Sequence, residues 1–473
     1  MPRCFLGAAA FSAAVCCCFC CCNPARAAER ELISEPTAAR HGLTRPWFTQ
    51  AQLDQGRGRL RAMVLSGGVL YVQTDGAVFE AIDAETGRML WRKQVGRRDR
   101  LTMPPGVGHD VLAVLNGSHM YVLNRMTGEM LYDKEVGGAP SAAPGVSDTR
   151  VYVPLTSGRV EAYRWAPPPQ AAPDANEKAD EKTDKKKGKD SGDDDFLKKA
   201  LNAEEQRRNE LEQRARWVPP LFCQSSKPVL TQPRITRQNA DEEYSVWSTD
   251  RGLLNITRID RKAEDLLALA YRLETKAPVV GRPAYLPPDP KIKGDSGLIL
   301  AASRDGFVHV IRQKDGRLAW RFSTGDPVLE PPVVVDLRVY VCTQLGGMYC
   351  LAANDGRVAW FAPRAVQLVA VSKTKVYAAD RTGRLLVLDG ATGKLLDTLP
   401  TIGLPLKLRN DETDRIYLAD DLGLIQCLHE PEQHEPILHG KDRRQAEQIQ
   451  SEETKKGETK KPAAKKPAAK SSK

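Results

Sequence analysis

Two aspartates are the first residues of this 473-residue chain that could do chemistry, as general bases or as cation ligands. Asp83 and Asp389 each open a D-x-x-T-G segment. Aspartate at the start of a tight turn accepts hydrogen bonds from the backbone that follows it, and glycine adopts the left-handed conformation that such a turn needs. We therefore predict a structural role, not a catalytic one, for both carboxylates.

Three histidines near the C-terminus, His429, His434 and His439, are spaced by five residues. That spacing suits neither one face of a helix nor a compact zinc motif, so we predict a solvated loop. The sequence also contains no H-E-x-x-H, G-x-S-x-G or P-loop motif. We predict no catalytic, cofactor-binding or metal-binding residue.

Most of the cysteines lie in an apolar N-terminal segment that includes the run from Cys16 to Cys22, where cysteine behaves as a small hydrophobic residue. Four cysteines lie further along the chain, at positions 223, 342, 350 and 427. Cys342 and Cys350 flank one predicted hairpin turn. They form either a cross-strand disulfide, which an exported compartment permits, or two buried free thiols.

A repeated motif of a tight turn and a tryptophan must position these side chains. Residues 81–91 read A-x-D-x-x-T-G-x-x-x-W, and degenerate copies end in Tyr132, Trp320 and Trp360. A tryptophan on the strand after the turn can pack its large apolar face against a neighbouring sheet. The residues to which we assign this structural packing between repeats are Trp47, Asp83, Gly87, Trp91, Gly128, Trp320, Trp360, Asp389 and Gly393.

Hairpins of alternating pattern recur about every 40 residues, the length of one four-stranded propeller blade. In the first hairpin, residues 69–73 and 78–82 flank a turn at Asp75-Gly76, where we expect the glycine to take a positive φ. One such sheet cannot bury both of its faces alone, so the copies must pack around an axis. We predict an all-β fold, an eight-bladed β-propeller of four-stranded antiparallel blades. Seven blades is the alternative, because the copy around Tyr244 is the weakest.

These motifs, from Trp47 to Leu438, resemble the PQQ-type repeat family. That family includes the eight-bladed quinoprotein dehydrogenases and non-enzymatic relatives such as the envelope lipoprotein of the outer-membrane barrel assembly machine. Resemblance to the enzymes implies pyrroloquinoline quinone (PQQ) in the central channel, Ca²⁺ held by Glu, Asn and Asp side chains, and a disulfide between adjacent cysteines. The only adjacent cysteines here lie in the N-terminal apolar segment.

The function that we predict is therefore a non-catalytic envelope scaffold, not an enzyme, which binds a protein or polymer partner without a cofactor. Two alternatives stay open. The first is a PQQ-dependent quinoprotein oxidoreductase with PQQ and calcium, and the second is a sensor of a small ligand in the channel. We expect the protein to be a monomer.

Composition divides the chain into a folded part and polar segments. Residues 1–27 read as a signal peptide with cleavage after Ala27, followed by a leader at residues 28–42. The propeller is predicted at residues 43–440, with an insertion at residues 166–217 that is disordered and then helical. We expect export to the periplasm or cell envelope, and an uncleaved membrane anchor is the alternative to a cleaved signal.

Residues 441–473 form a tail rich in Lys, Pro and Ala, which we expect to be disordered and which concentrates much of the net charge of +10. Such a tail binds polyanions by counterion release. Its candidate partners are an anionic surface polymer or lipid, with no specific nucleic acid.

The two ends of the propeller are predicted to share one blade. The last hairpin is followed by Pro431 and Pro436, which disfavour a regular outer strand. The segment from Trp47 to Gln52 resembles the outer strand that contains Trp91 and would complete that blade. Deleting residues 44–54 should therefore destabilise the whole ring, whereas deleting the leader should not.

Overall fold

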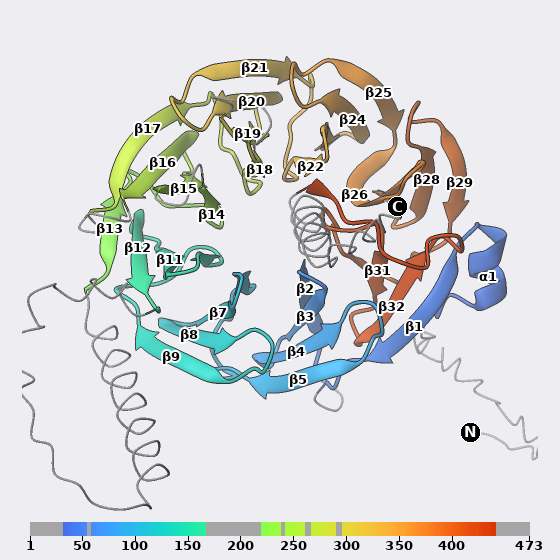
Figure 1. Ribbon diagram of the computed structural model, residues 1–473, viewed down its shortest axis with the longest axis horizontal. Helices are drawn as coiled ribbons and strands as arrows, with labels where there is room; N and C mark the ends of the chain where they lie inside the picture. The colour runs from blue at the N-terminus through green and yellow to red at the C-terminus, as the bar shows by residue number, and fades with distance from the viewer. Residues whose placement is uncertain are drawn as a thin grey trace, which may run out of the picture.

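The computed structural model describes residues 32–53, 58–166, 219–237, 242–260, 266–289 and 296–440. In this part of the chain, 32 strands form eight four-stranded antiparallel sheets arranged around a central axis (Figure 1). The predicted fold class is confirmed, and the count is eight blades, not seven. The predicted signal peptide, nearly all of the insertion and the C-terminal tail lie outside the described residues.

Blades are numbered along the chain, and the strands of each blade are given in order from the innermost to the outermost. Blades 1 to 4 consist of β2 (Leu60–Ser66), β3 (Val69–Thr74), β4 (Val78–Asp83) and β5 (Met89–Gln94); β6 (Gly106–Val107), β7 (Val111–Asn116), β8 (His119–Asn124) and β9 (Met130–Glu135); β10 (Gly145–Val146), β11 (Arg150–Pro154), β12 (Arg159–Arg164) and β13 (Leu221–Gln224); and β14 (Arg234–Arg237), β15 (Glu242–Ser248), β16 (Leu253–Asp260) and β17 (Ala268–Glu274).

Blades 5 to 8 consist of β18 (Ala284–Leu286), β19 (Leu298–Ala302), β20 (Phe307–Arg312) and β21 (Leu318–Ser323); β22 (Val333–Val335), β23 (Arg338–Thr343), β24 (Gly347–Ala352) and β25 (Val358–Pro363); β26 (Ala365–Val371), β27 (Lys375–Asp380), β28 (Leu385–Asp389) and β29 (Leu395–Leu399); and β30 (Leu406–Lys407), β31 (Ile416–Ala419), β32 (Leu424–His429) and β1 (Thr44–Gln50).

The two middle strands of each blade make the core. Every residue of β3 is buried, and so is every residue of β7, because both faces of a blade are covered by its neighbours. The outer strands alternate instead: in β5 only the Trp91 side of the strand is buried. Burial on both faces therefore explains why the middle strands are continuous runs of apolar residues.

The turn of the first hairpin differs from the prediction. The residue with positive φ is Ala77 (φ 56°), not Gly76. In blades 3 to 8 the matching position is a glycine, such as Gly158 (φ 82°) or Gly423 (φ 90°). The turn in blade 1 is shifted by one residue, and it accepts a fully buried alanine methyl in the left-handed conformation.

The ring closes by strand exchange between the chain ends, as predicted. β1 pairs antiparallel with β32, with Trp47 opposite Cys427, and the sheet order of blade 8 is β1-β32-β31-β30. Figure 1 shows β1 beside β32 at this seam. The closing blade thus combines residues separated by most of the chain, and it leaves no open edge between the termini.

The leader is not the inert segment that the sequence suggested. It forms α1 (Glu35–Arg40), which Ser34 caps by accepting from the Thr37 amide. Ile33, Ala38 and Leu43 are buried in a core cluster with side chains of blades 7 and 8. Since that burial contributes to the folded state, deleting the leader should weaken the seam. In the described part of the chain, α1 is the one helix, and six residues are far too few to span a bilayer.

One further expectation is corrected, and one open alternative is decided. His429 and His439 are buried instead of lying in a solvated loop, whereas His434 is exposed. His429 is the last residue of β32, and Nε2 of His439, in the segment that folds back over the propeller, contacts the carbonyl of Val371 at 2.8 Å. Cys342 and Cys350 are free thiols, because Cys342 faces Met348 across the ladder and Cys350 faces Tyr340.

Candidate functional site

The predicted packing residues meet in pairs between consecutive blades. Trp91 on β5 of blade 1 lies against Gly128 in the tight turn of blade 2: a Cβ added to Gly128 would lie 2.7 Å from the indole ring. The indole Nε1 donates to the carbonyl of Arg125 at 2.9 Å. Gly128 also has φ of 70°. Only glycine suits this position, both for the backbone and for the ring that covers it.

The same contact recurs at four other interfaces. In each, an outer-strand aromatic covers a glycine of positive φ in the next blade and donates to a carbonyl of the same turn. The pairs are Trp47 with Gly87 and Ala84, Tyr271 with Gly316 and Gln313, Trp320 with Gly356 and Ala353, and Trp360 with Gly393 and Gly390. Sequence reasoning missed Tyr271, although the D-G-R turn around Gly316 was a signal for its partner.

Asp83 and Asp389 direct their carboxylates into their own turns. Oδ1 of Asp83 accepts from the amide of Thr86 at 2.8 Å and from its hydroxyl at 2.7 Å. Asp389 makes the equivalent bonds with Thr392 at 2.7 and 2.6 Å, and the Thr392 hydroxyl and amide lower the pKa of Asp389. Hydrogen bonds that favour the charged form fit a turn cap better than a general base.

Three interfaces depart from this pattern. Where the tryptophan would stand, blade 2 has Tyr132, blade 3 has Leu221 and blade 7 has Asp397. Asp397 contacts Nδ1 of His41, at the end of α1, at 2.6 Å. The leader therefore packs at the seam between blades 7 and 8, one of the two interfaces where the aromatic is missing.

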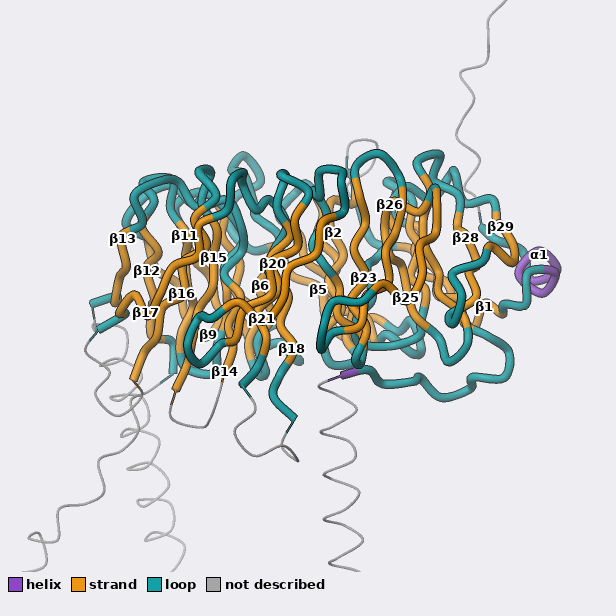
Figure 2. Tube along the Cα trace, turned by 90° about the horizontal axis from the view of Figure 1, so that it is seen from above, coloured by secondary structure: helices purple, strands orange, loops and turns teal. Residues whose placement is uncertain are grey.

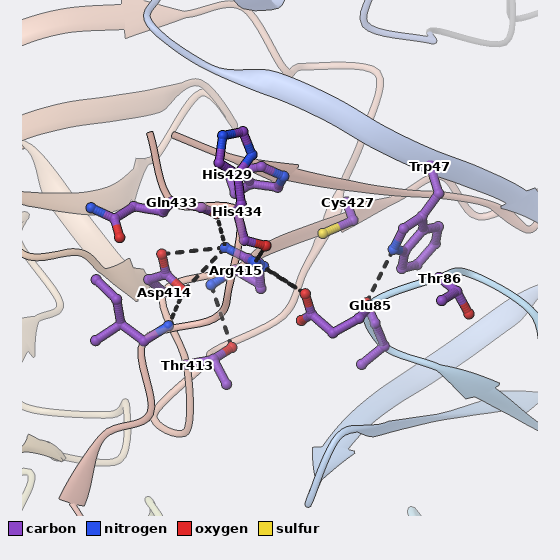
Figure 3. Close-up of polar contacts among 12 residues, drawn as sticks. Trp47, Glu85, Thr86, Thr413, Asp414, Arg415, Cys427, His429, Gln433 and His434 are labelled. Carbon is purple, nitrogen blue, oxygen red and sulfur yellow. Dashed lines mark hydrogen bonds and ion pairs between the residues drawn. The ribbon is translucent and has the colours of Figure 1, made fainter. Parts of the chain in front are cut away.

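A buried arginine holds the closing blade to blade 1 and to the C-terminal segment (Figure 3). The Arg415 guanidinium lies 3.0 Å from Oε2 of Glu85, and it donates to the carbonyls of Gln433 and His434, each at 3.0 Å. Asp414 is next to it and accepts from the Ile437 amide at 2.9 Å. Burial raises the pKa of Asp414, against the opposing effects of that amide and of Arg415. Since Arg415 is hydrogen-bonded on several sides, this network is structural.

The antiparallel strands give the propeller two unlike faces, visible as the two rims of loops in Figure 2. The clasp face holds the turns between the first and second and between the third and fourth strands of each blade. The loop face holds the turns between the second and third strands and the connections from blade to blade. The packing glycines belong to the clasp face, because they lie between third and fourth strands.

Exposed apolar side chains gather on the loop face. In the described part of the chain this face exposes Leu101, Leu230, Val280, Leu345, Ile402 and Leu422. The clasp face exposes Met126, Leu266 and Leu337. Leu101 is 73% exposed, the largest fraction of the set. Exposed apolar groups gathered on one face are typical of protein interaction surfaces.

A pocket of about 570 Å³ opens on the loop face at blade 2. Its apolar walls come from the connections that precede and follow blade 2, with Leu101, Met103, Val136 and Pro140. Glu135 is the one ionisable residue among those that line it. A pocket of this kind suits an apolar side chain of a partner, inserted as an anchor. No local sequence pattern predicts this pocket, because its walls are loops without a motif.

The described residues contain no group of three or more His, Cys, Asp and Glu side chains that could hold a metal ion.

Comparisons with known proteins agree with this geometry. The model of the family described as "Outer membrane protein assembly factor BamB" matches residues 38–166 and 245–415, more than half of the chain. A curated protein of that name from Legionella pneumophila (strain Paris) is 29% identical over 96 residues, which are 20% of this chain. The match spans only 25% of that relative.

Solved structures share the fold. BamB from Moraxella catarrhalis superposes with a TM-score of 0.55 and 12% identity, over 83% of this chain and 99% of that one. Sqt1 from Saccharomyces cerevisiae gives 0.55 and 9%, over 81% and 97%. The computationally designed Ika8 protein gives 0.53 and 12%, over 80% and 98%. At these identities the likeness concerns the fold alone.

Proposed function

The chain belongs to the family of the outer membrane protein assembly factor BamB, and from this we propose that it is a non-catalytic scaffold of the cell envelope that binds a protein partner through its loop face. The observation that supports the proposal most is that the loop face exposes apolar side chains all around the ring, one of which, Leu101, lines the pocket at blade 2. The relatives are named for outer-membrane protein assembly, so the partner that we propose is a component of such machinery.

The physical argument rests on the unlike faces. The glycine turns and the Arg415 network occupy the clasp face, where substitutions would disturb the packing of the ring. The loop face is free of that constraint, and its leucine and isoleucine side chains leave much of their apolar surface exposed. Burying such side chains against a partner would contribute about 25 cal/mol for each Å² of apolar surface.

Envelope location is part of the same proposal. The signal peptide predicted at residues 1–27 would deliver the chain to the periplasm. The Lys-rich tail at residues 441–473 would add weak attraction to an anionic polymer or lipid. The propeller supplies specificity, and the tail supplies non-specific attraction that added salt should weaken.

Site-specific photocrosslinking in the native envelope tests the binding face. A photoreactive residue at Leu101 or Ile402 should capture one and the same protein, whereas the same residue at Met126 or Leu337 on the clasp face should not. Capture of that protein from the clasp-face positions alone would overturn the assignment.

Affinity gives the second readout. With the captured protein in purified form, Leu101→Glu should weaken binding about tenfold or more, as expected for a charge placed at an interface anchor. Met126→Glu is the matched control, because Met126 is also exposed and apolar but lies on the clasp face. The two variants should melt at the same temperature as the parent protein.

The oxidoreductase alternative is tested separately. Addition of PQQ and Ca²⁺ with an artificial electron acceptor should give no turnover for a panel of alcohols and sugars. Turnover that depends on the quinone would replace the scaffold proposal.

A further inference from the structure

The connection from blade 1 to blade 2 carries an exposed leucine and a run of arginines on the loop face. It spans residues 95–105 and is the longest connection between consecutive blades, since those that follow blades 2 to 5 have nine residues each. It reads V-G-R-R-D-R-L-T-M-P-P, so three arginines precede Leu101. This connection therefore differs from its neighbours in both length and charge.

A buried asparagine fixes the shape of this connection. Asn116, the last residue of β7, is 1% exposed. It accepts from the Arg97 amide at 2.9 Å and donates to the carbonyls of Arg97 and Arg100 at 2.8 and 3.3 Å. The next residue, Gly117, donates its amide to the Leu101 carbonyl at 2.8 Å. Hydrogen bonds from a buried side chain and from the backbone therefore hold the connection in one conformation.

Leu101 stays outside the core although the chain around it is fixed. Its side chain is 73% exposed and lines the pocket at blade 2. Met103, two residues further along, instead packs against the core cluster that blades 2 and 3 share. An apolar side chain on a fixed connection loses little conformational freedom when a partner buries it, so this leucine suits an anchor contact.

Arg100 places a positive charge at the edge of the same pocket. Its aliphatic stem packs over Gly117, which lines the pocket: a Cβ added to Gly117 would lie 2.8 Å from Cδ of Arg100. Arg97 is neutralised by Asp99, to which it donates twice, at 3.0 and 2.9 Å. Among the described residues, no carboxylate pairs with the Arg100 guanidinium. Arg100 can therefore receive a carboxylate from a partner.

Glu135 gives the wall that follows blade 2 the opposite charge. It is the last residue of β9, it is exposed, and it lines the pocket. This wall is fixed as well, because the Gly137 amide donates to the Glu161 carboxylate at 3.2 Å and to the Tyr163 hydroxyl at 3.1 Å. The pocket thus has apolar walls, a cation from one connection and a carboxylate beside the other.

We propose that this pocket binds a short linear peptide segment in which a large apolar residue has aspartate or glutamate on one side of it. The apolar side chain would fill the pocket against Leu101, and an acidic side chain would pair with Arg100. Glu135 would repel acidic residues on the other side of the anchor. Charge complementarity of this kind sets specificity and register, while the buried apolar anchor supplies most of the affinity.

This inference rests on the proposed function, because it names the chemistry of the segment that a protein partner would present to the loop face. Peptide selection on the purified full chain tests that chemistry without knowledge of the partner. A phage library of random short peptides is first depleted on Leu101→Glu, which removes phage that bind the Lys-rich tail or another surface, and is then selected on the parent. The surviving peptides should share a large apolar residue with Asp or Glu on one side.

The shared peptide is then synthesised, and its Kd is measured by fluorescence anisotropy. Arg100→Glu should weaken binding about tenfold, because it places a like charge beside the acidic residues. Arg100→Gln, which only removes the charge, should give a smaller loss. Arg304→Glu is the matched control and should bind like the parent, because Arg304 is exposed on the loop face of blade 5, away from the pocket. Thermal melting checks that each variant is folded.

A second peptide, with acidic residues on both sides of the anchor, tests the role of Glu135. The parent should bind it more weakly than the selected peptide, and Glu135→Lys should reverse that order. Equal ranking of the two peptides by the parent and Glu135→Lys would overturn the assigned register.

Three results would overturn the inference as a whole. They are survivors without acidic residues, no survivor after depletion, and equal binding of the selected peptide by the parent and Arg100→Glu. The proposed function fails separately, when photoreactive residues at Leu101 and Ile402 capture no common protein even though acidic peptides bind. A captured partner whose binding ignores Arg100→Glu would leave the scaffold proposal standing and overturn this one.

Discussion

The interface between blades 5 and 6 and the interface between blades 2 and 3 differ in one contact. At the first, Trp320 covers Gly356 and donates to the Ala353 carbonyl at 2.9 Å. At the second, Tyr132 is buried, but no glycine turn in the described part of blade 3 receives it. The predicted insertion lies between β12 and β13 in the sequence, where the other blades have the covered turn, and nearly all of it is outside the described residues.

The difference shows where a propeller of this kind accepts added sequence. A covered turn is constrained twice, by its positive φ and by the aromatic side chain that packs on its glycine. Extra residues in such a turn would displace that aromatic side chain. A turn that no aromatic side chain covers has neither constraint.

Removing the closing strand should have the largest effect. Deletion of residues 44–53 takes β1 from blade 8, together with Trp47 and its contact with Gly87. The edge of β32 would then be open and the seam to blade 1 unfilled, so we expect loss of the cooperative thermal transition in circular dichroism. Deletion of residues 174–190, within the insertion, is the control and should leave the melting temperature within about 2 °C.

Truncating the aromatics separates the two kinds of interface. Trp320→Ala should lower the free energy of unfolding by about 3–5 kcal/mol, as for large buried aromatics in general. Leu221→Ala, at the equivalent position of blade 3, should cost about 1–2 kcal/mol, because the side chain is only partly buried. Chemical denaturation measures both. Equal losses would mean that the covered turn contributes nothing beyond the buried area.

How much of this was visible in the sequence depends on how local each feature is. The tryptophans and their turns recur as short motifs, so Trp91, Trp320 and Trp360 could be located from spacing alone. Tyr271 was missed because the sequence just before it lacks the D-x-x-T-G turn that precedes Trp91. The burial of His439 arises from a contact with Val371, far away in the sequence.

The leader shows the same limit. Ile33, Ala38 and Leu43 are too few and too irregular to predict a packed element, yet the missing aromatic at Asp397 leaves room for them at the seam between blades 7 and 8. The loop-face pocket is a product of the folded ring, because its walls come from separate connections. No local pattern marks residues that become neighbours only when eight blades close.

Two glycines of positive φ, one covered by an aromatic side chain and one uncovered, measure how much the covering contact contributes to stability. Gly393 has φ of 72°, and a Cβ there would lie 2.5 Å from the Trp360 ring. Gly325 has φ of 76° with nothing within 4 Å of the added Cβ. Gly325→Ala should cost only the left-handed backbone term of about 1–2 kcal/mol. Gly393→Ala should cost about 1–3 kcal/mol more, through displacement of the indole. If both variants lose a similar free energy of unfolding in urea, the Trp360 indole can shift at little cost.

The contact between His41 and Asp397 should have the smallest effect, and it should depend on pH. Burial alone would raise the pKa of Asp397, but the hydrogen bonds from His41 and from the Thr398 amide outweigh it and hold the pKa below its usual range. A lowered carboxyl pKa in the folded state gives stability that is present above the usual carboxyl pKa of about 4 and is lost as the pH falls through the folded value. The Asp397 side chain is 42% exposed, so solvent screening limits the contribution to under about 1 kcal/mol.

His41→Ala should therefore unfold at a slightly lower urea concentration than the parent at pH 5.5, and the gap should narrow at pH 3. Asp397→Asn, which removes the titrating group, should show the same narrowing. A gap that stays constant or widens toward pH 3 would mean that His41 stabilises the seam by packing alone. The seam between blades 7 and 8 would then resemble the covered interfaces, with the leader in the place of the missing tryptophan, and the polar contact would be incidental to closure.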